Sequence, residues 1–333
     1  MPTRVYPYLA IIAVGLATPS QAADTATAQQ DGVSWLKRMA SASRQLNYSG
    51  TFVYRHDFRT ETSRIVHYVN AAGGEFERLE TLDGPMREVI RTNDQVVCYL
   101  PESKTVLMEK RGKRQFPAVL PDRLTGVSEN YAVRVGGMDR VAGHDCQVII
   151  LEPRDKLRYG HQFCADSGSG LPLRSRTFNE KKEPLESFVF TELTIGGSFN
   201  RDKVRSRYAA KSRDWKVDHS GYPTGEVSSN TGWVLTQQPA GFRKLTELKR
   251  SIAGRTVMVS HIVYSDGLAA VSVFIEPLPK AARIAQSLSH QGAVNIYIRP
   301  VADHMVTVLG EAPAATVMQI ANSLEYRGVA PPR

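Results

Sequence analysis

About ten short runs of alternating apolar and polar residues follow one another along the first two-thirds of the chain, with few helix-like segments between them. Glycine, proline, asparagine and aspartate separate the runs. Parallel strands would need a crossover connection after every run, so this order predicts an antiparallel meander. Because a large meander must curl to hide its apolar face, we expect one strongly curved sheet, an open half-barrel. The predicted strands are 51–56, 64–69, 75–79, 95–100, 105–108, 131–135, 146–152, 159–165, 171–178 and 187–193.

A helix opens the predicted fold and a smaller unit closes it. Asp31 is a suitable N-cap for a helix that ends near Asn47 and lies on the concave side of the sheet. Residues 219–232 are rich in Ser, Gly, Thr and Asn, which is typical of a linker. From Trp233, two hairpins and a helix that starts at Pro313 indicate a small domain. The predicted class is α+β, with a half-barrel domain at 31–200, a basic stretch and linker at 201–232, a small α+β domain at 233–326 and a tail at 327–333.

The first 22 residues have the pattern of an export signal. Arg4 precedes a short apolar run from Leu9 to Ala17, and small residues follow, so we predict cleavage between Ala22 and Ala23. An uncleaved membrane anchor is the alternative, for which the run is short. Residues 23–30 are small and polar, and we expect a disordered lead-in there. The signal predicts a periplasmic protein, and full secretion is the alternative.

The chain has three cysteines, so at least one stays unpaired in an oxidising compartment. Cys146 and Cys164 flank two strand-like runs that are joined near Asp155. A hairpin folded about Asp155 sets the two cysteines opposite each other, which brings them within reach of a disulfide. Two packed thiols are the alternative. Cys98 lies in the apolar run VVCYL, which favours a buried core residue over a nucleophile.

The common catalytic motifs are missing from the sequence. It contains no GxSxG, HExxH, GxxxxGK[ST] or CxxC pattern and no GxGxxG after a strand, and its eight histidines are scattered. We therefore expect no catalytic residue, no metal and no cofactor, which favours a binding protein over an enzyme. A hydrolase stays an alternative, because catalytic groups can be brought together by the fold.

Positive charge is concentrated in two clusters, at 110–114 and 201–216, within a chain of net charge +9. Exported proteins seldom meet nucleic acid, so we expect no nucleic-acid partner. The excess of positive charge favours a partner that is an acidic protein segment or an anionic lipid headgroup. The alternative is that the basic residues only form a solvated face. The candidate partner-binding residues are Arg205, Arg207, Lys211 and Arg213 of the basic stretch, with Tyr264 and Phe274 of the small domain.

A curved sheet with inward-facing aromatic residues can hold an apolar guest. Period-two positions of the predicted strands supply such residues, and the alternative is that helices cover them completely. The candidate cavity residues are Phe52, Tyr54, Phe76, Leu79, Phe163, Phe188 and Phe190.

Several longer strings are similar to one family. They are YSGTFVYRHDFRTETSRIVHYV (48–69), ERLETLDGPMREVIR (77–91), the segment 123–193, QPAGF (238–242), VYSDGLAAVSVFIEP (263–277) and DHMVTVLGEAPAATV (303–317). Together they resemble the MucB/RseB family of periplasmic negative regulators of sigma factor E. The resemblance covers nearly all of the predicted mature chain, in order and in both domains.

The resemblance implies a large domain similar to the lipoprotein carriers LolA and LolB. It also implies a partner, because the family binds the periplasmic segment of a membrane-anchored anti-sigma factor of the RseA/MucA type and shields it from regulated proteolysis. Lipid, lipopolysaccharide or acylated ligands are the implied release signals, and a homodimer is plausible for the family. A lipoprotein or lipid carrier is the alternative function, but transport would not require the added domain at 233–326.

Overall fold

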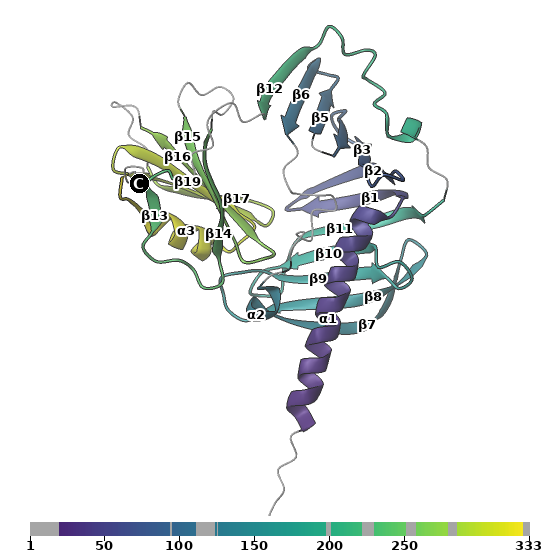
Figure 1. Cartoon of the computed structure of the whole chain (residues 1–333), viewed down its shortest axis with the longest axis horizontal. Helices are drawn as coiled ribbons and strands as arrows, with labels where there is room; N and C mark the ends of the chain where they lie inside the picture. Colours follow the sequence, from purple (N-terminus) through teal and green to yellow (C-terminus); the bar gives the residue numbers. More distant parts are fainter. Residues whose placement is uncertain are drawn as a thin grey trace, which may run out of the picture.

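We describe the chain from a computed structural model, which covers residues 20–93, 95–110, 124, 126–197, 201–221, 230–250, 258–278 and 285–328 (Figure 1). One large sheet with a long helix across it forms the first domain, and a smaller sheet with a short helix forms the second (Figure 1). This α+β arrangement around an open curved sheet confirms the predicted fold class.

The large sheet contains twelve strands among the described residues, in the order β12-β6-β5-β4-β3-β2-β1-β11-β10-β9-β8-β7. It joins two antiparallel meanders, β1–β6 and β7–β11, through the pair β1–β11. The strands are β1 Tyr48–His56, β2 Arg59–Val69, β3 Glu75–Thr81, β4 Glu88–Thr92, β5 Gln95–Leu100, β6 Thr105–Lys110, β7 Tyr131–Val141, β8 His144–Pro153, β9 Gly160–Asp166, β10 Pro172–Phe178, β11 Pro184–Ile195 and β12 Lys216–Gly221.

Two strands of the large sheet were not predicted. β4 lies at Glu88–Thr92, and β12 at Lys216–Gly221 pairs in parallel with β6. Residues 216–221 were assigned to the basic stretch and linker on their polar composition, but an edge strand needs only backbone hydrogen bonds on one side. The linker prediction is therefore wrong for this segment, while residues 222–229 lie outside the described residues.

The helix α1 (Ser20–Gln45) crosses one face of the large sheet, in front of β1 and β7–β11 (Figure 1). We call this the inner face. Leu36 and Met39 are fully buried against residues of β7, β8 and β9 that include Ile149 and Phe163. Since the helix already begins at Ser20, residues 23–30 are helical, and the expected disordered lead-in and the N-cap at Asp31 are wrong. The alanines of this segment favour helix, which outweighs its polar composition. Ala22 and Ala23 lie in this helix, and cleavage between them stays a prediction.

Gln29 of α1 closes part of the free edge of the large sheet. Its carboxamide donates to the Tyr131 carbonyl over 3.1 Å and accepts from the Val133 backbone N–H over 2.8 Å. Both backbone groups belong to β7, the last strand of the sheet, which has a partner strand on one side only. The side chain thus satisfies a donor and an acceptor that an edge strand otherwise presents to solvent or to another chain.

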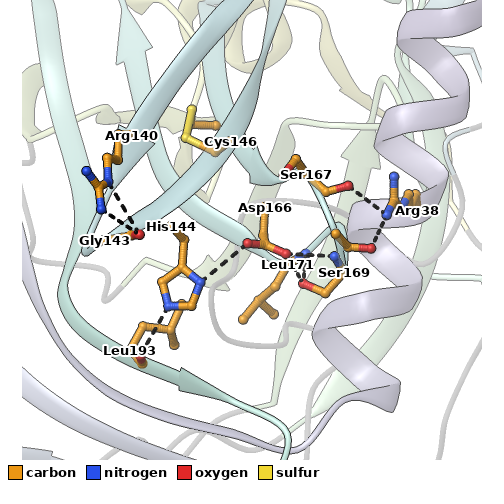
Figure 2. Close-up of polar contacts among 12 residues, drawn as sticks. Arg38, Arg140, Gly143, His144, Cys146, Asp166, Ser167, Ser169, Leu171 and Leu193 are labelled. Carbon is orange, nitrogen blue, oxygen red and sulfur yellow. Dashed lines mark hydrogen bonds and ion pairs between the residues drawn. A yellow bond between two sulfur atoms is a disulfide. The ribbon is translucent and has the colours of Figure 1, made fainter.

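Arg38 fastens the middle of α1 to the β9–β10 turn (Figure 2). Its guanidinium donates to the carbonyls of Ser167 and Gly168. The same turn is shaped by Asp166, whose carboxylate accepts from the Ser169 backbone N–H and hydroxyl over 2.6 and 2.7 Å. Helix and sheet are therefore joined by directed contacts as well as by the apolar core.

A disulfide joins Cys146 of β8 to Cys164 of β9, with the Cα atoms 5.4 Å apart. The two cysteines are diagonal neighbours, because Cys146 pairs with Asp166 and Cys164 pairs with Val148. The predicted direct opposition is wrong, since the connection is centred on Lys156 and not on Asp155. Cys98 is half-buried in β5 and is the free cysteine of the described chain.

The small domain has a six-stranded antiparallel sheet in the order β14-β15-β16-β19-β18-β17, with α3 contacting β18 and β19. Val317 and Ile320 of α3 are fully buried against strand residues such as Val273 and Val306. Both predicted hairpins and the predicted helix are present. The elements are β13 Trp233–Leu235, β14 Arg243–Arg250, β15 Val259–Ser265, β16 Ala270–Pro277, β17 Ser287–Gln291, β18 Val294–Val301, β19 His304–Gly310, α3 Ala314–Asn322 and β20 Leu324–Tyr326, which pairs with β13. Two short helical segments, α2 Val127–Asn130 and η1 Arg201–Val204, lie in the large domain.

Candidate ligand pocket between the two domains

A cavity of about 310 Å³ lies where the inner face of the large sheet meets the small domain. Alternation along β1 and β11 turns Phe52, Tyr54 and Phe188 to the inner face, because every second side chain of a strand shares one face. The small domain closes the cavity with the β15–β16 turn and with the residue that follows β19. The lining residues are Phe52, Tyr54, Glu61, Ser63, Leu79, Arg87, His161, Ser175, Thr177, Glu186 and Phe188 of the large domain and Leu268, Ala269 and Glu311 of the small domain.

The apolar part of the pocket rests on a packed aromatic cluster. The Phe52 and Phe188 rings lie 5.0 Å apart, and Phe190 packs edge-on against both of them at 6.1 and 5.1 Å. Such tilted and edge-to-face contacts are the favourable arrangements for aromatic pairs. The floor of the pocket is therefore preformed.

A chain of polar contacts runs along one wall of the pocket. Glu186 accepts from the Tyr54 hydroxyl over 2.7 Å and from the Thr177 hydroxyl over 3.2 Å, and the same Thr177 oxygen lies 3.3 Å from Nδ1 of His161. Burial lowers the pKa of His161 to about 4, so its imidazole is neutral at pH 7. Three glutamates and one arginine line the pocket, so its charge is opposite in sign to that of the whole chain.

The two domains meet around the β8–β9 connection, residues 154–159, whose Arg158 is completely buried. Its guanidinium donates to the Ala240 carbonyl over 2.6 Å and lies 3.4 Å from the Asp266 carboxylate of the small domain. The rings of Tyr131 and Phe242 flank the guanidinium at 5.8 and 5.4 Å. A cation of the large domain is thus buried between the two domains.

Further contacts hold the domains together around this centre. Thr316 donates to the Leu157 carbonyl over 2.8 Å, and Asn295 donates to the Tyr159 hydroxyl over 2.8 Å. Gly241 has a φ of 77°, and a Cβ atom there would lie 2.2 Å from Oδ1 of Asn130, so only glycine fits this approach. The interface is closely packed and includes the string QPAGF at 238–242.

Asp57 makes a separate contact between the two domains. Its carboxylate accepts from the Gly292 backbone N–H over 2.7 Å, and this bond lowers the pKa of Asp57. His290 of the small domain lies 3.8 Å from the same carboxylate. The β1–β2 turn of the large domain is therefore attached to the β17–β18 turn.

Family models match both domains of the chain. The MucB/RseB N-terminal domain matches residues 31–208, and the MucB/RseB C-terminal domain matches residues 227–325. The chain belongs to the MucB/RseB family. It is 32% identical over 309 residues to the sigma factor AlgU regulatory protein MucB of Pseudomonas aeruginosa, over 92% of this chain and 94% of the relative. It is 25% identical to the sigma-E factor regulatory protein RseB of Escherichia coli K12, over 87% of this chain and 89% of the relative.

Solved structures of the family match in both domains. The complex of P. aeruginosa MucA and MucB superposes with a TM-score of 0.72 at 31% identity, over 90% of this chain and 100% of that chain. A crystal structure of MucB without a stated partner gives a TM-score of 0.62 at 30% identity, over 89% and 98% of the two chains.

Four of the seven predicted cavity residues line the pocket: Phe52, Tyr54, Leu79 and Phe188. Phe190 lies behind Phe52 and Phe188 as a core residue, and Phe163 is buried under α1. Phe76 stacks on Tyr68 at 5.9 Å beneath the guanidinium of Arg201. The helix thus covers part of the aromatic face and leaves part of it open, and a role in ligand binding stays a prediction.

The predicted partner residues fall in different environments. Arg205 and Arg207 are exposed and paired with Asp202 and Glu80, at 3.1 and 2.7 Å, while Lys211 and Arg213 are exposed after η1. In the small domain, Phe274 is half-buried and stacks on His261 at 4.3 Å. Tyr264 is buried in the domain core, because strand alternation turns it inward, so its proposal as a surface contact is wrong.

Sequence reasoning missed Arg158 and Asp266, which occupy the centre of the interface. Asp266 was recognised only as part of a turn, and Arg158 only as one residue of a connection. Within the described ranges, no group of three or more His, Cys, Asp or Glu side chains is placed to hold a metal ion. No helix in this part of the chain is long and apolar enough to cross a membrane.

Proposed function

We propose that this protein restrains an envelope stress response by binding the periplasmic part of a membrane-anchored anti-sigma factor of the RseA/MucA type. One observation carries the proposal. The similarity to MucB in its complex with the periplasmic part of MucA spans 90% of this chain, and therefore includes both domains. Relatives with regulatory names match over a similar length.

The proposed mode of action is steric and requires no bond to be made or broken. A segment held between two domains is removed from the active site of a protease, because cleavage needs an extended and accessible chain. The protein therefore acts as a binding protein and not as an enzyme. The expected location is the periplasm, which agrees with the predicted export signal and with a disulfide between Cys146 and Cys164.

Release by an acyl chain is the second part of the proposal. The pocket has an apolar floor, and its volume of about 310 Å³ is at the lower end of the range for ligand sites. It suits one alkyl chain better than a whole lipid with several chains. A guest that weakens partner binding tenfold needs a coupling free energy of ~1.4 kcal/mol between the two sites.

The primary test is calorimetric titration of the mature protein with the periplasmic segment of an RseA/MucA-type anti-sigma factor from the same organism. We expect saturable binding to the segment and none to a scrambled segment of the same composition. Addition of the protein should also slow cleavage of the segment by a site-1 type protease. Absence of binding under these conditions would disprove the proposed function.

A lipoprotein or lipid carrier is the second candidate, favoured by the apolar pocket alone. Capture from solubilised membranes separates the two functions. A regulator retains one single-span anti-sigma protein, whereas a carrier retains many lipoproteins. A homodimer is also expected, and sedimentation of the mature protein would measure it.

A further inference from the structure

Asp266 belongs to the domain interface and to the turn that forms the pocket wall. It lies in the β15–β16 turn of the small domain, and its side chain is completely buried. Its two carboxylate oxygens have different partners. Oδ2 faces the large domain, and Oδ1 shapes the turn.

On the interface side, Oδ2 is 3.4 Å from the Arg158 guanidinium and 3.3 Å from the Tyr131 hydroxyl. The Asp266 backbone carbonyl accepts from the Asn130 carboxamide over 2.9 Å. All three partners belong to the large domain. Asp266 is therefore the small-domain residue around which the buried polar part of the interface is built.

On the pocket side, Oδ1 accepts from the backbone N–H groups of Leu268 and Ala269 over 2.9 and 2.8 Å. These two residues form part of the pocket wall. Leu268 also packs against the apolar cluster beneath α1. The position of this wall relative to the large sheet is thus set by the residue that faces Arg158.

The buried ion pair between Asp266 and Arg158 contributes little net free energy to the domain interface. Burial raises the pKa of Asp266 despite the nearby Arg158 and the backbone N–H donors, so loss of hydration outweighs the attraction. Asp155 lies 3.1 Å from Nε of Arg158, so the cation keeps an anionic neighbour when Asp266 moves away. Separation of the domains would return both charges to water. The desolvation cost therefore lowers the net contribution of this ion pair to the closed arrangement.

We propose that Asp266 couples occupation of the apolar pocket to the arrangement of the two domains. A guest that pushes Leu268 outward moves the turn and withdraws Asp266 from Arg158. Conversely, separation of the domains removes Leu268 and Ala269 from the pocket wall. By linkage, a guest that prefers the separated arrangement must bind more tightly once the Asp266 contact is broken.

The test measures the distance between two spin labels, one in each domain. Met138 of β7 and Leu288 of β17 are exposed and suit replacement by cysteine, in a Cys98→Ser background that keeps the native disulfide. The probe is octyl glucoside, a neutral single-chain detergent used below its micelle concentration. We expect one main distance without the probe and a second, longer distance with it.

Asp266→Asn is the informative variant, because it keeps an oxygen for the turn and removes the charge that faces Arg158. We expect the separated population to rise about tenfold without the probe, the change that ~1.4 kcal/mol of coupling produces. The probe should bind this variant more tightly. Tyr131→Phe removes only the hydroxyl that donates to Oδ2 of Asp266. It should also raise the separated population, but by less.

Arg243→Gln is the matched control. Arg243 and Glu129 also form an ion pair between the domains, at 3.7 Å, but both side chains are about two-thirds exposed. We expect no change in either distance. Unchanged distances and probe affinity in both Asp266→Asn and Tyr131→Phe would overturn the proposal. The inference rests on the proposed entry of an acyl chain into the pocket. These measurements contain no anti-sigma segment, so their failure would leave the proposed binding of that segment standing.

Discussion

The two halves of the large sheet are built differently. In the covered half, β7–β11 beneath α1, the buried residues are mainly apolar, and Val133, Ile149 and Leu151 are at most 1% exposed. In the open half, β2–β6, every residue of β5 is half-buried, and the buried residues include Glu77 and Glu88. The covered half is a conventional core, while the open half combines buried apolar residues such as Ile65 with paired polar groups.

The comparison shows how one sheet can serve two purposes. In the covered half, α1 buries the apolar residues of the inner face, and this packing makes the half rigid. The open half and β1 keep part of the inner face free, and the pocket lies between this part and the neighbouring strands β9–β11. The small domain meets the large one mainly around the β8–β9 connection. Substitutions in the two halves should therefore have different effects on stability.

Truncation of the helix contact should have the largest effect. Leu36→Ala removes a fully buried side chain from the covered half, and we expect a loss of ~2–5 kcal/mol in the free energy of unfolding. Leu100→Ala in β5 is the matched control, since this leucine is half-buried, and it should cost less than ~1.5 kcal/mol. Urea unfolding measures both. Equal losses would contradict the division into halves.

Removal of the disulfide should follow in size. The double variant Cys146→Ala/Cys164→Ala opens a loop between residues 18 apart in sequence, which predicts a loss of ~3 kcal/mol. Cys98→Ser in the open half is the control and should cost ~1 kcal/mol or less, because this side chain is only half-buried. A double variant as stable as the control would show that the bond contributes little.

Glu88 offers a test of the polar half. Its carboxylate accepts from the Ser206 hydroxyl and from the Arg207 backbone N–H over 3.1 Å. Glu88→Gln loses the charge on these hydrogen bonds, and we expect a loss of ~1–3 kcal/mol. Thr105→Ala, a neighbouring change in the same half, removes only an exposed hydroxyl contact and serves as the control. If both variants matched the wild type, buried charge would not be a stabilising element here.

The smallest expected effect is a pH dependence at the border of the covered half. Because burial lowers the pKa of His161 from 6.5 to about 4, the folded protein keeps the imidazole neutral where the unfolded chain takes up a proton. Its contribution to stability is complete above pH 6.5 and is lost as the pH falls toward 4. His161→Gln should therefore weaken the fall in the urea midpoint between pH 7 and pH 5. An unchanged slope would exclude His161 as its source.

Local patterns predicted the architecture, because alternation, turn residues and helical spacing act over a few residues. The hairpin at Ser265-Asp266-Gly267 and the helix after Pro313 are examples. β4 was not predicted because Glu88 breaks the apolar pattern, and its burial depends on donors more than 100 residues away.

The site was predictable only in part for the same reason. Alternation places Phe52 and Phe188 on one face of the sheet. It does not predict how much of that face α1 covers, so Phe163 and Phe190 were assigned to the cavity although they are core residues. Arg158 and Asp266 are 108 residues apart, and nothing near either one indicates the pairing. Contacts between domains depend on the assembled surfaces.

The carboxamide of Gln29 has a practical consequence for making this protein. The family match starts at residue 31, which invites expression of a chain trimmed to that point. Such a chain would lack Gln29 and would leave the Tyr131 carbonyl and the Val133 N–H of β7 available to a neighbouring molecule. Protein that begins at Ala23 should stay monomeric or in small oligomers on storage. Protein that begins at residue 31 should form polymers through the exposed edge of β7.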